Sequence, residues 1–398
     1  MSFEPVYWDE PKRFEFESKV EKVDGNRIIL EKTYFHPEEG GQPADKGTLN
    51  SCEVKDVQNE GGMVVHYLVP SHDLEEGEEV EGKIDEDFRR YCMRAHTGAH
   101  VMFGAGRKVL GKVDYSGFDI RKGKIRIDFE TETHVDKNTL LKLEELCNRV
   151  ILEDRSVGWE MWDQEEVKEN QEVAFAKEFP HGEKVRVIEV EDWDLGVCSG
   201  THLSNTLDVG RIHVLGKKKL QEGVTRITFC VGEEALKRDY REKRSLQRAT
   251  SHLETDHSNL PRKISDLLDN LDDLQEEIEE MEALRVEHRI ENSERYKREN
   301  YDLLLQTLQT STDHSDIISH KAKDNVGHSE VLVLINEDES VSVTVGVGDK
   351  VEDISADDIL QELSREFGGG GGGTSKFAQG GGFQASSEEI KNLVLNRF

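Results

Sequence analysis

Two pairs of potential metal ligands, about a hundred residues apart, constrain the fold of this 398-residue chain more than any other feature. His96 and His100 lie four residues apart in a segment with helical apolar spacing, so both imidazoles project from one helical face, one turn apart. Cys198 and His202 repeat the four-residue step in the segment VCSGTHLSNT. Three imidazole nitrogens and one thiolate suit tetrahedral zinc. The sequence therefore predicts a fold that gathers two distant segments around one zinc ion per chain.

Each pair has a simpler interpretation when it is taken alone. A histidine pair on a helix is more often packed or exposed without a metal, and a free cysteine is commonly buried as a small apolar side chain. The zinc-protease pattern requires a glutamate directly after the first histidine, where this chain has Thr97. A zinc peptidase is therefore disfavoured, and only the two pairs together indicate a metal.

The cysteines and the apolar segments indicate where such a protein works. Five cysteines are an odd number scattered over a long chain, which does not describe a disulfide framework. No stretch approaches the roughly 20 apolar residues of a membrane helix, and the start MSFEPVYWDE lacks the features of a signal peptide. We expect a soluble, cytoplasmic protein with no membrane partner.

The chain is strongly acidic. It contains 83 acidic and 52 basic residues, which give a formal net charge of −31, with 35% hydrophobic residues. Such a balance normally repels nucleic acid, but at about 1 M salt the Debye length is only roughly 3 Å. Regular apolar periodicity argues against disorder as the explanation. We interpret the charge as an adaptation to molar intracellular salt.

The pattern of apolar residues predicts an α+β multidomain protein. The first region, with short strands and glycine-rich turns, predicts a small β-barrel-like domain. The second carries both ligand pairs and predicts an α+β zinc domain. The third predicts a helical hairpin or coiled coil, and the fourth a small α+β domain with a glycine-rich loop. The predicted boundaries are 1–86, 87–235, 236–310 and 311–398.

A heptad pattern supports the helical region. Two complementary apolar series recur every seven residues, namely Leu260, Leu267, Leu274 and Met281, and Ile264, Leu271 and Ile278. Pro261 marks the expected break between two helices. Residues 254–294 contain 14 Asp/Glu and 4 Lys/Arg, which favours a solvated helix surface.

Two segments are candidates for contacts with RNA. Residues 211–248 contain 11 Lys/Arg against 5 Asp/Glu, an excess of six that predicts a phosphate track, although an ordinary exposed turn and helix face is the alternative. The glycine run 368–373 lets backbone amides approach phosphates, and its flanking patterns favour an ordered loop over a flexible linker. The candidate residues are Lys217, Lys218, Lys219, Arg241, Lys243, Arg244, Gly370 and Gly371.

Three motifs, taken together and in their order along the chain, carry a resemblance to a known family. HTGAH at 96–100, CSGTH at 198–202 and TYFHPEEGGQPADKG at 33–47 strongly resemble the alanyl-tRNA editing family, whose free-standing members are called AlaX. The segment 210–232 is similar to the end of the editing domain of alanyl-tRNA synthetase, and KFAQGGG at 376–382 resembles that synthetase's DHH-associated C-terminal domain. The arrangement looks like the long form of AlaX, and we expect no room upstream for an aminoacylation domain.

The resemblance implies a zinc-dependent editing domain in region 87–235 and a hydrolase that removes serine or glycine from mischarged alanine tRNA. It assigns the zinc to His96, His100, Cys198 and His202, and the glycine-rich motif to Gly40, Gly41, Gln42, Asp45 and Gly47. Ala99 stands where the family's motif often carries a hydroxyl residue. It also implies a homodimer formed through the C-terminal region.

Several alternatives stay open at this point. Thr33 and Gln42 are the candidate catalytic or pocket-lining residues, but Gln42 and its glycines also suit a simple turn. Zinc can polarise the ester carbonyl, activate water or orient the substrate's amino group. A non-catalytic tRNA-binding protein with a structural zinc is the alternative function, whereas a phosphodiesterase is disfavoured because the chain has no DHH sequence.

Overall fold

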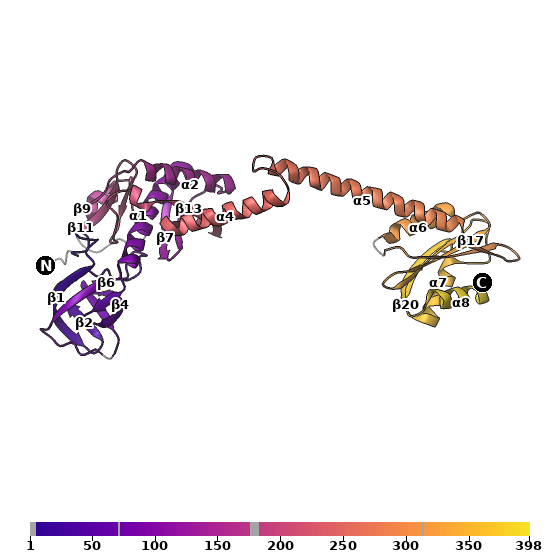
Figure 1. Cartoon of the computed structure of the whole chain (residues 1–398), viewed down its shortest axis with the longest axis horizontal. Coiled ribbons are helices and arrows are strands. Elements are labelled where there is room, and N and C mark those ends of the chain that lie inside the picture. Colours follow the sequence, from indigo (N-terminus) through magenta and orange to yellow (C-terminus); the bar gives the residue numbers. More distant parts are fainter. Residues whose placement is uncertain (1–4, 71, 176–182, 312–313) are drawn as a thin grey trace. The chain divides into compact units, whose positions relative to one another are not determined.

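The computed structural model describes residues 5–70, 72–175, 183–311 and 314–398. The chain divides into two compact units, Met1–Ala249 and Thr250–Phe398 (Figure 1). Both units combine helices with sheets, so the predicted α+β multidomain class is confirmed. In the described part of the chain, none of the helices has the length and apolar character needed to cross a membrane.

The first unit begins with a closed six-stranded barrel. Its strands alternate buried apolar and exposed polar residues, as in Glu79–Ile84, and they surround a core that includes Phe16, Phe35 and Leu49. This agrees with the predicted barrel-like domain. In spatial order the strands are β1 (Glu15–Asp24), β2 (Arg27–Leu30), β5 (Met63–Leu68), β4 (Cys52–Glu60), β3 (Gly47–Leu49) and β6 (Glu79–Ile84).

A long helix, α1 (Glu86–Leu110), follows the barrel directly. Asp85 caps it by accepting a hydrogen bond from the Phe88 amide at 3.0 Å. One turn further on, Arg89 is fully buried and paired with Asp45 of the barrel. Arg89 also donates to the carbonyls of Pro11 at 2.7 Å and Tyr34 at 2.6 Å. This network joins the helix that carries His96 to the barrel.

The rest of the first unit consists of two four-stranded sheets and the helices packed on them. One large apolar core, which includes Met93, Phe103 and Phe129, lies between α1, α2 and the sheet β13-β14-β8-β7. The smaller sheet has the order β10-β12-β11-β9. The elements are β7 (Asp114–Arg121), β8 (Lys124–Glu130), α2 (Lys137–Leu152), β9 (Val157–Asp163), α3 (Gln164–Glu169), β10 (Val173–Ala174), β11 (Lys184–Val190), β12 (Asp194–Val197), η1 (Leu207–Val209), β13 (Ile212–Gln221) and β14 (Val224–Val231).

Two helices follow, α4 (Gly232–His252), most of which belongs to the first unit, and α5 (Leu260–Glu291) in the second. The break between them precedes Pro261, which occupies the first turn of α5, where its missing amide hydrogen costs nothing. The heptad side chains of α5 are largely exposed, for example Leu271 at 61% and Met281 at 58%. The coiled coil therefore stays a prediction.

The second unit is built on one six-stranded sheet with the order β15-β16-β17-β18-β20-β19. Its first two strands lie within 236–310, where only helix was predicted from the sequence. The prediction is wrong there because the apolar run Leu303–Leu305 is buried in this sheet. The elements are β15 (Glu294–Lys297), β16 (Asp302–Leu308), α6 (Ser315–Asn325), β17 (Glu330–Glu337), β18 (Val341–Val347), α7 (Ala356–Phe367), β19 (Gly370–Gly373), β20 (Phe377–Phe383) and α8 (Ser387–Arg397).

The glycine run forms an ordered strand in this sheet. β19 pairs with β20, and a Cβ atom on Gly371 would come within 2.4 Å of the Gln379 carbonyl oxygen. Only glycine permits this approach, so the run is a structural element and not a flexible linker.

Candidate metal centre

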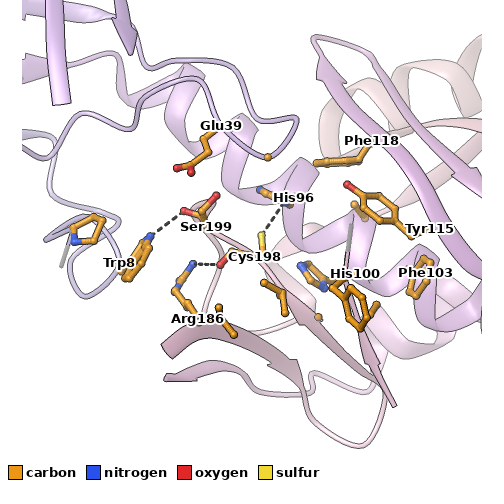
Figure 2. Close-up of a pocket in the computed structure, with 18 of the residues that line it drawn as sticks. Trp8, Glu39, His96, His100, Phe103, Tyr115, Phe118, Arg186, Cys198 and Ser199 are labelled. Carbon is orange, nitrogen blue, oxygen red and sulfur yellow. Dashed lines mark hydrogen bonds between the residues drawn. The ribbon is translucent and has the colours of Figure 1, made fainter. Parts of the chain in front are cut away.

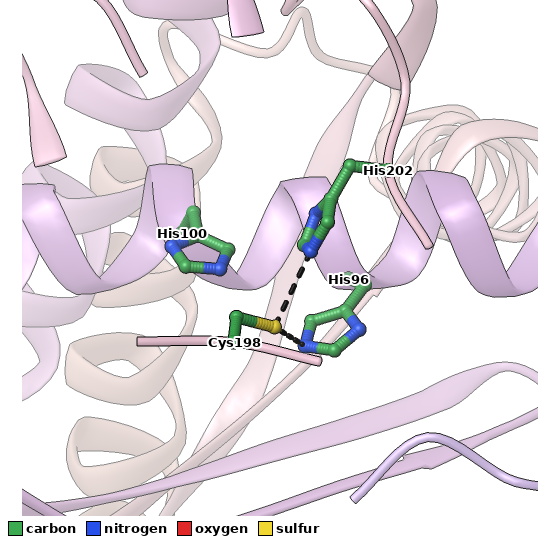
Figure 3. A group of neighbouring side chains, drawn as sticks. All are labelled: His96, His100, Cys198 and His202. Carbon is green, nitrogen blue, oxygen red and sulfur yellow. Dashed lines mark hydrogen bonds between the residues drawn. The ribbon is translucent and has the colours of Figure 1, made fainter. Parts of the chain in front are cut away.

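The structure brings the two predicted ligand pairs together. One potential ligand atom from each of His96, His100, Cys198 and His202 lies within 4.8 Å of the others (Figure 3). Cys198 Sγ is 3.1 Å from His96 Nε2 and 3.3 Å from His202 Nε2. Ligand bonds of about 2.0 to 2.3 Å in a tetrahedron place sulfur and nitrogen roughly 3.5 Å apart. The donor set and the two sulfur–nitrogen distances therefore fit zinc, and the widest pair in the cluster, at no more than 4.8 Å, would close somewhat on binding.

Helix α1 and the end of β12 position these ligands. His96 and His100 project from one face of α1 with ring centroids 5.9 Å apart. Cys198 follows β12 directly, and hydrogen bonds from two side chains hold the backbone of its loop. Arg186 donates to the carbonyls of Cys198 at 3.2 Å and Gly200 at 2.7 Å, and Trp8 Nε1 donates to the Ser199 carbonyl at 2.9 Å. These bonds fix the backbone of the loop.

Two of the histidines are oriented by buried hydrogen-bond partners. Gln42 Oε1 accepts from the Thr201 amide at 3.0 Å, which identifies it as the acceptor that faces His96 Nδ1 at 2.9 Å. Asp194 Oδ2 lies 2.8 Å from His100 Nδ1. Each bond keeps the proton on Nδ1 and leaves Nε2 free to bind a metal. His202 differs, because its buried Nδ1 has no hydrogen-bond partner among the described residues.

Mutual electrostatics favour the metal-binding form of the cysteine. Burial alone would raise the pKa of Cys198, but His96 and His202 hold it well below the usual range. Burial opposes the charged form of His100 as well, yet the bonds to Asp194 and Cys198 raise its pKa to about 10. Burial lowers the pKa of His202 well below its ordinary value. The cysteine is thus held as a thiolate, and a divalent cation that binds here would displace the Nε2 proton of His100.

A cavity of about 690 Å³ adjoins the cluster (Figure 2). Phe103, Tyr115 and Phe118 contribute aromatic wall, and Glu39, Arg186 and Ser199 contribute polar wall. Arg186 lies 4.9 Å from the ring centroid of Trp8 and 5.1 Å from that of Trp159, and burial lowers its pKa to about 10. Burial also raises the pKa of Glu39, although a hydrogen bond with Ser199 opposes the shift.

The two other predicted site residues are placed differently from each other. Gln42 is fully buried and reaches the site through His96 and Thr201, so it orients a ligand instead of lining the cavity. Thr33 is buried in the barrel, where its hydroxyl lies 2.8 Å from His66 Nε2, and it is absent from the cavity wall. The hydroxyl of Thr33 thus has a partner within the barrel, and its pocket-lining role stays a prediction.

The predicted RNA contacts belong to both units. The candidate lysines are exposed on β13, the candidate arginines and Lys243 are exposed on α4, and Gly370 and Gly371 are exposed on β19. Lys217 Nζ also donates to the carbonyl of Val135, so one of its hydrogen bonds is made within the fold and not to RNA.

Four residues around the ligands were not predicted from the sequence. No local sequence pattern marks these residues, which are Asp194, Arg186, Trp8 and Glu39. Only the folded arrangement brings them to the cluster. Asp194 lies four residues before Cys198, so a search for carboxylates near the ligand motif is the one signal that would have found it.

Comparisons with known proteins agree with this architecture. Family models match at 8–88 (tRNA synthetases class II (A)), 185–228 (threonyl and alanyl tRNA synthetase second additional domain) and 300–397 (DHHA1 domain). Alanine–tRNA ligase of Pyrococcus abyssi is 34% identical over 94% of this chain and 41% of that protein. The Methanopyrus kandleri enzyme is 31% identical over 95% of this chain and 42% of that protein. The chain thus spans about two fifths of the length of these relatives.

The solved C-Ala domain of Aquifex aeolicus alanyl-tRNA synthetase is 17% identical, with a TM-score of 0.23, and the match covers 26% of this chain and 96% of that chain. The fold and the site define a multidomain protein built from domains that occur in alanyl-tRNA synthetases. Within this class the chain is related to alanyl-tRNA synthetases through its second additional domain and its DHHA1 domain, which confirms the resemblance seen in its motifs.

Replacing Asp194 should weaken the metal site without removing a ligand. Asp194→Asn keeps the size of the side chain but loses the charge that orients His100, so we expect the dissociation constant for zinc to rise by about 10- to 100-fold. Competition with a chromogenic chelator measures this change. Asp192→Asn, at an exposed position two residues away, is the matched control and should leave the constant unchanged.

Proposed function

We propose that the chain is a trans-editing hydrolase that deacylates alanine tRNA mischarged with serine or glycine. The observation that carries the proposal is the convergence of His96, His100, Cys198 and His202 beside a cavity large enough for an aminoacylated nucleoside. The relationship to alanyl-tRNA synthetases supports the choice of alanine tRNA.

The roles of the chain's own residues follow from their positions. The four ligands would hold one zinc ion, which supplies Lewis-acid polarisation of an ester or a more acidic bound water. Gln42 and Asp194 orient His96 and His100, and Arg186 fixes the loop of Cys198. The aromatic wall of Phe103, Tyr115 and Phe118 excludes water from one side of the cavity and offers surfaces for base stacking. His202, which lacks a partner at Nδ1 among the described residues, is the ligand we expect to exchange most readily.

The function is tested by deacylation in molar salt, the condition that the net charge of −31 favours. We expect the purified chain to hydrolyse serine-charged alanine tRNA at least about 100-fold faster than buffer and to spare the alanine-charged form. Chelation should stop the reaction while circular dichroism changes little. Unfolding on chelation, with no hydrolysis beforehand, would instead support the tRNA-binding protein with a structural zinc.

The exposed lysines of β13 should contribute to tRNA affinity. The double variant Lys218→Ala/Lys219→Ala removes two positive charges from the proposed track, and the slope of log K against log salt should become shallower by about 2. Fluorescence anisotropy with labelled tRNA at several KCl concentrations gives this slope. Lys22→Ala/Lys55→Ala, which changes exposed barrel lysines, should leave the slope unaltered.

We also propose that the protein is a homodimer formed through its C-terminal region. The exposed apolar heptad side chains of α5, including Leu267, Leu271 and Leu274, offer a surface that a second copy would bury. Light scattering should then give twice the chain mass of 45.3 kDa. A mass of one chain contradicts this part of the proposal.

A further inference from the structure

The wall of the cavity contains an acidic side chain that the metal centre does not use. Among the described residues that line the cavity, Glu39 and Asp194 are the only acids, and Asp194 is 3% exposed and engaged with His100. Glu39 is half-buried and forms no ion pair with any lysine or arginine in the described part of the chain. Figure 2 shows its carboxylate directed towards Ser199, next to Cys198. A negative charge is thus available beside the proposed reaction centre.

The fold fixes the position of Glu39. It begins a tight turn in which the Glu39 amide donates to the Gln42 carbonyl at 3.2 Å and the Gln42 amide donates to the Glu39 carbonyl at 3.0 Å. The Ile120 amide of β7 donates to the Gly41 carbonyl at 3.0 Å, which holds the turn against the sheet. Gly41 has a φ of +81°, and a Cβ atom there would lie 2.6 Å from the Phe118 carbonyl oxygen. The turn that orients His96 through Gln42 therefore also carries Glu39.

The proposed substrate has a cationic group near the scissile bond. In an aminoacyl ester, the α-amino group lies one carbon from the ester carbonyl and is partly protonated near pH 7, since peptide α-amino groups have a pKa of about 7.7 to 8.0 and the ester lowers this value. Arg186 and Lys184, the arginine and lysine among the described residues of the cavity wall, would repel such a group, whereas Glu39 would attract it. Charge pairs in a half-buried wall are screened by salt less than pairs in open solvent.

We propose that Glu39 binds the α-ammonium group of the aminoacyl ester and thereby selects esters with a free amino group over N-acylated ones. This inference rests on the proposed deacylase function and makes it specific for one chemical class of ester. Glu39 is a specificity-determining residue in this scheme, and an N-acylated ester is rejected because it leaves the carboxylate without its cation.

A binding experiment separates this inference from the catalytic one. The probes are 3′-deoxy-3′-(L-serylamino)adenosine, an amide that mimics the ester but resists hydrolysis, and its N-acetyl derivative. Isothermal titration at pH 7 with the zinc-loaded chain should show at least about 10-fold tighter binding of the free amine. Glu39→Gln should abolish this preference while leaving the affinity for the N-acetyl form unchanged, and Glu39→Asp should retain part of it. Glu38→Gln, at the exposed neighbouring position, is the control.

Four results would overturn the inference. They are equal affinity of the native chain for both probes, failure to bind either probe, a Glu39→Gln variant that keeps the preference, and a Glu39→Gln variant that loses both affinities equally. The last pattern would indicate that Glu39 only shapes the turn. If the Glu39→Gln variant keeps both probe affinities but deacylates tRNA more slowly, Glu39 has a proton-transfer role instead of a role in binding the amine. Selective binding of the amine without hydrolysis of tRNA would retain the role of Glu39 and remove the deacylase proposal.

Discussion

Cys198→Ala and His96→Ala should each lower deacylation of serine-charged alanine tRNA by about a thousandfold or more. Each change removes one of the four converging ligands and leaves the remaining donors with an incomplete coordination shell. Metal assistance contributes several kcal/mol to hydrolysis of this kind, and each 1.36 kcal/mol is a factor of ten in rate. Single-turnover kinetics in molar salt measure the rate. Elemental analysis should show one zinc ion per chain in the native protein and less in both variants.

The matched control for the cysteine change is Cys52→Ala. Cys52 is a half-buried free cysteine of β4 in the barrel, so its loss should change neither the rate nor the zinc content. Equal rates for the native chain, Cys198→Ala and His96→Ala would remove zinc from the mechanism. Lost zinc with an unchanged rate would do the same.

Arg89→Ala should reduce the free energy of unfolding of the first unit by about 3 to 5 kcal/mol. Arg89 and Asp45 are both essentially inaccessible to solvent, and the substitution leaves Asp45 as a buried charge without its partner. The carbonyls of Pro11 and Tyr34 lose a donor at the same time. Denaturant titration followed by tryptophan fluorescence measures the change, because Trp8 and Trp159 lie in this unit.

Arg90→Ala provides the comparison, since Arg90 is exposed, pairs with Glu86 on the same helix and lies 4.9 Å from the ring centroid of Phe14. Its loss should cost no more than about 0.5 kcal/mol. Similar effects of Arg89→Ala and Arg90→Ala would show that the buried pair contributes no more to the free energy of unfolding than an exposed ion pair does.

Local geometry explains how much of the site was predictable. A four-residue step on a helix places two imidazoles on one face in any fold, so His96 and His100 required only the helical pattern. The meeting with Cys198 depended on long-range packing, and the resemblance in the motifs supplied that information. Glu39 and Arg186 reach the cavity through the packing of the barrel and β11 against the Cys198 loop, which no local pattern encodes.

The fold was predictable where periodicity and burial agree. The barrel strands alternate clearly, and the helical pattern around the ligands is long. Residues 294–308 were misassigned because a short apolar run is compatible with a strand or a buried helix, and the sheet of the second unit decides between them. Thr33 shows a related ambiguity, since a hydroxyl can satisfy a buried group as readily as it can face a substrate.

The hydrogen bond from His96 to Gln42 makes the barrel a part of the metal centre. For the proposed zinc site, metal affinity and the docking of the barrel are consequently linked equilibria, and each strengthens the other by the same free energy. A variant that loosens the barrel will present as a metal-binding defect although all four ligands are intact. Conversely, saturating zinc will partly restore the attachment of a weakened barrel.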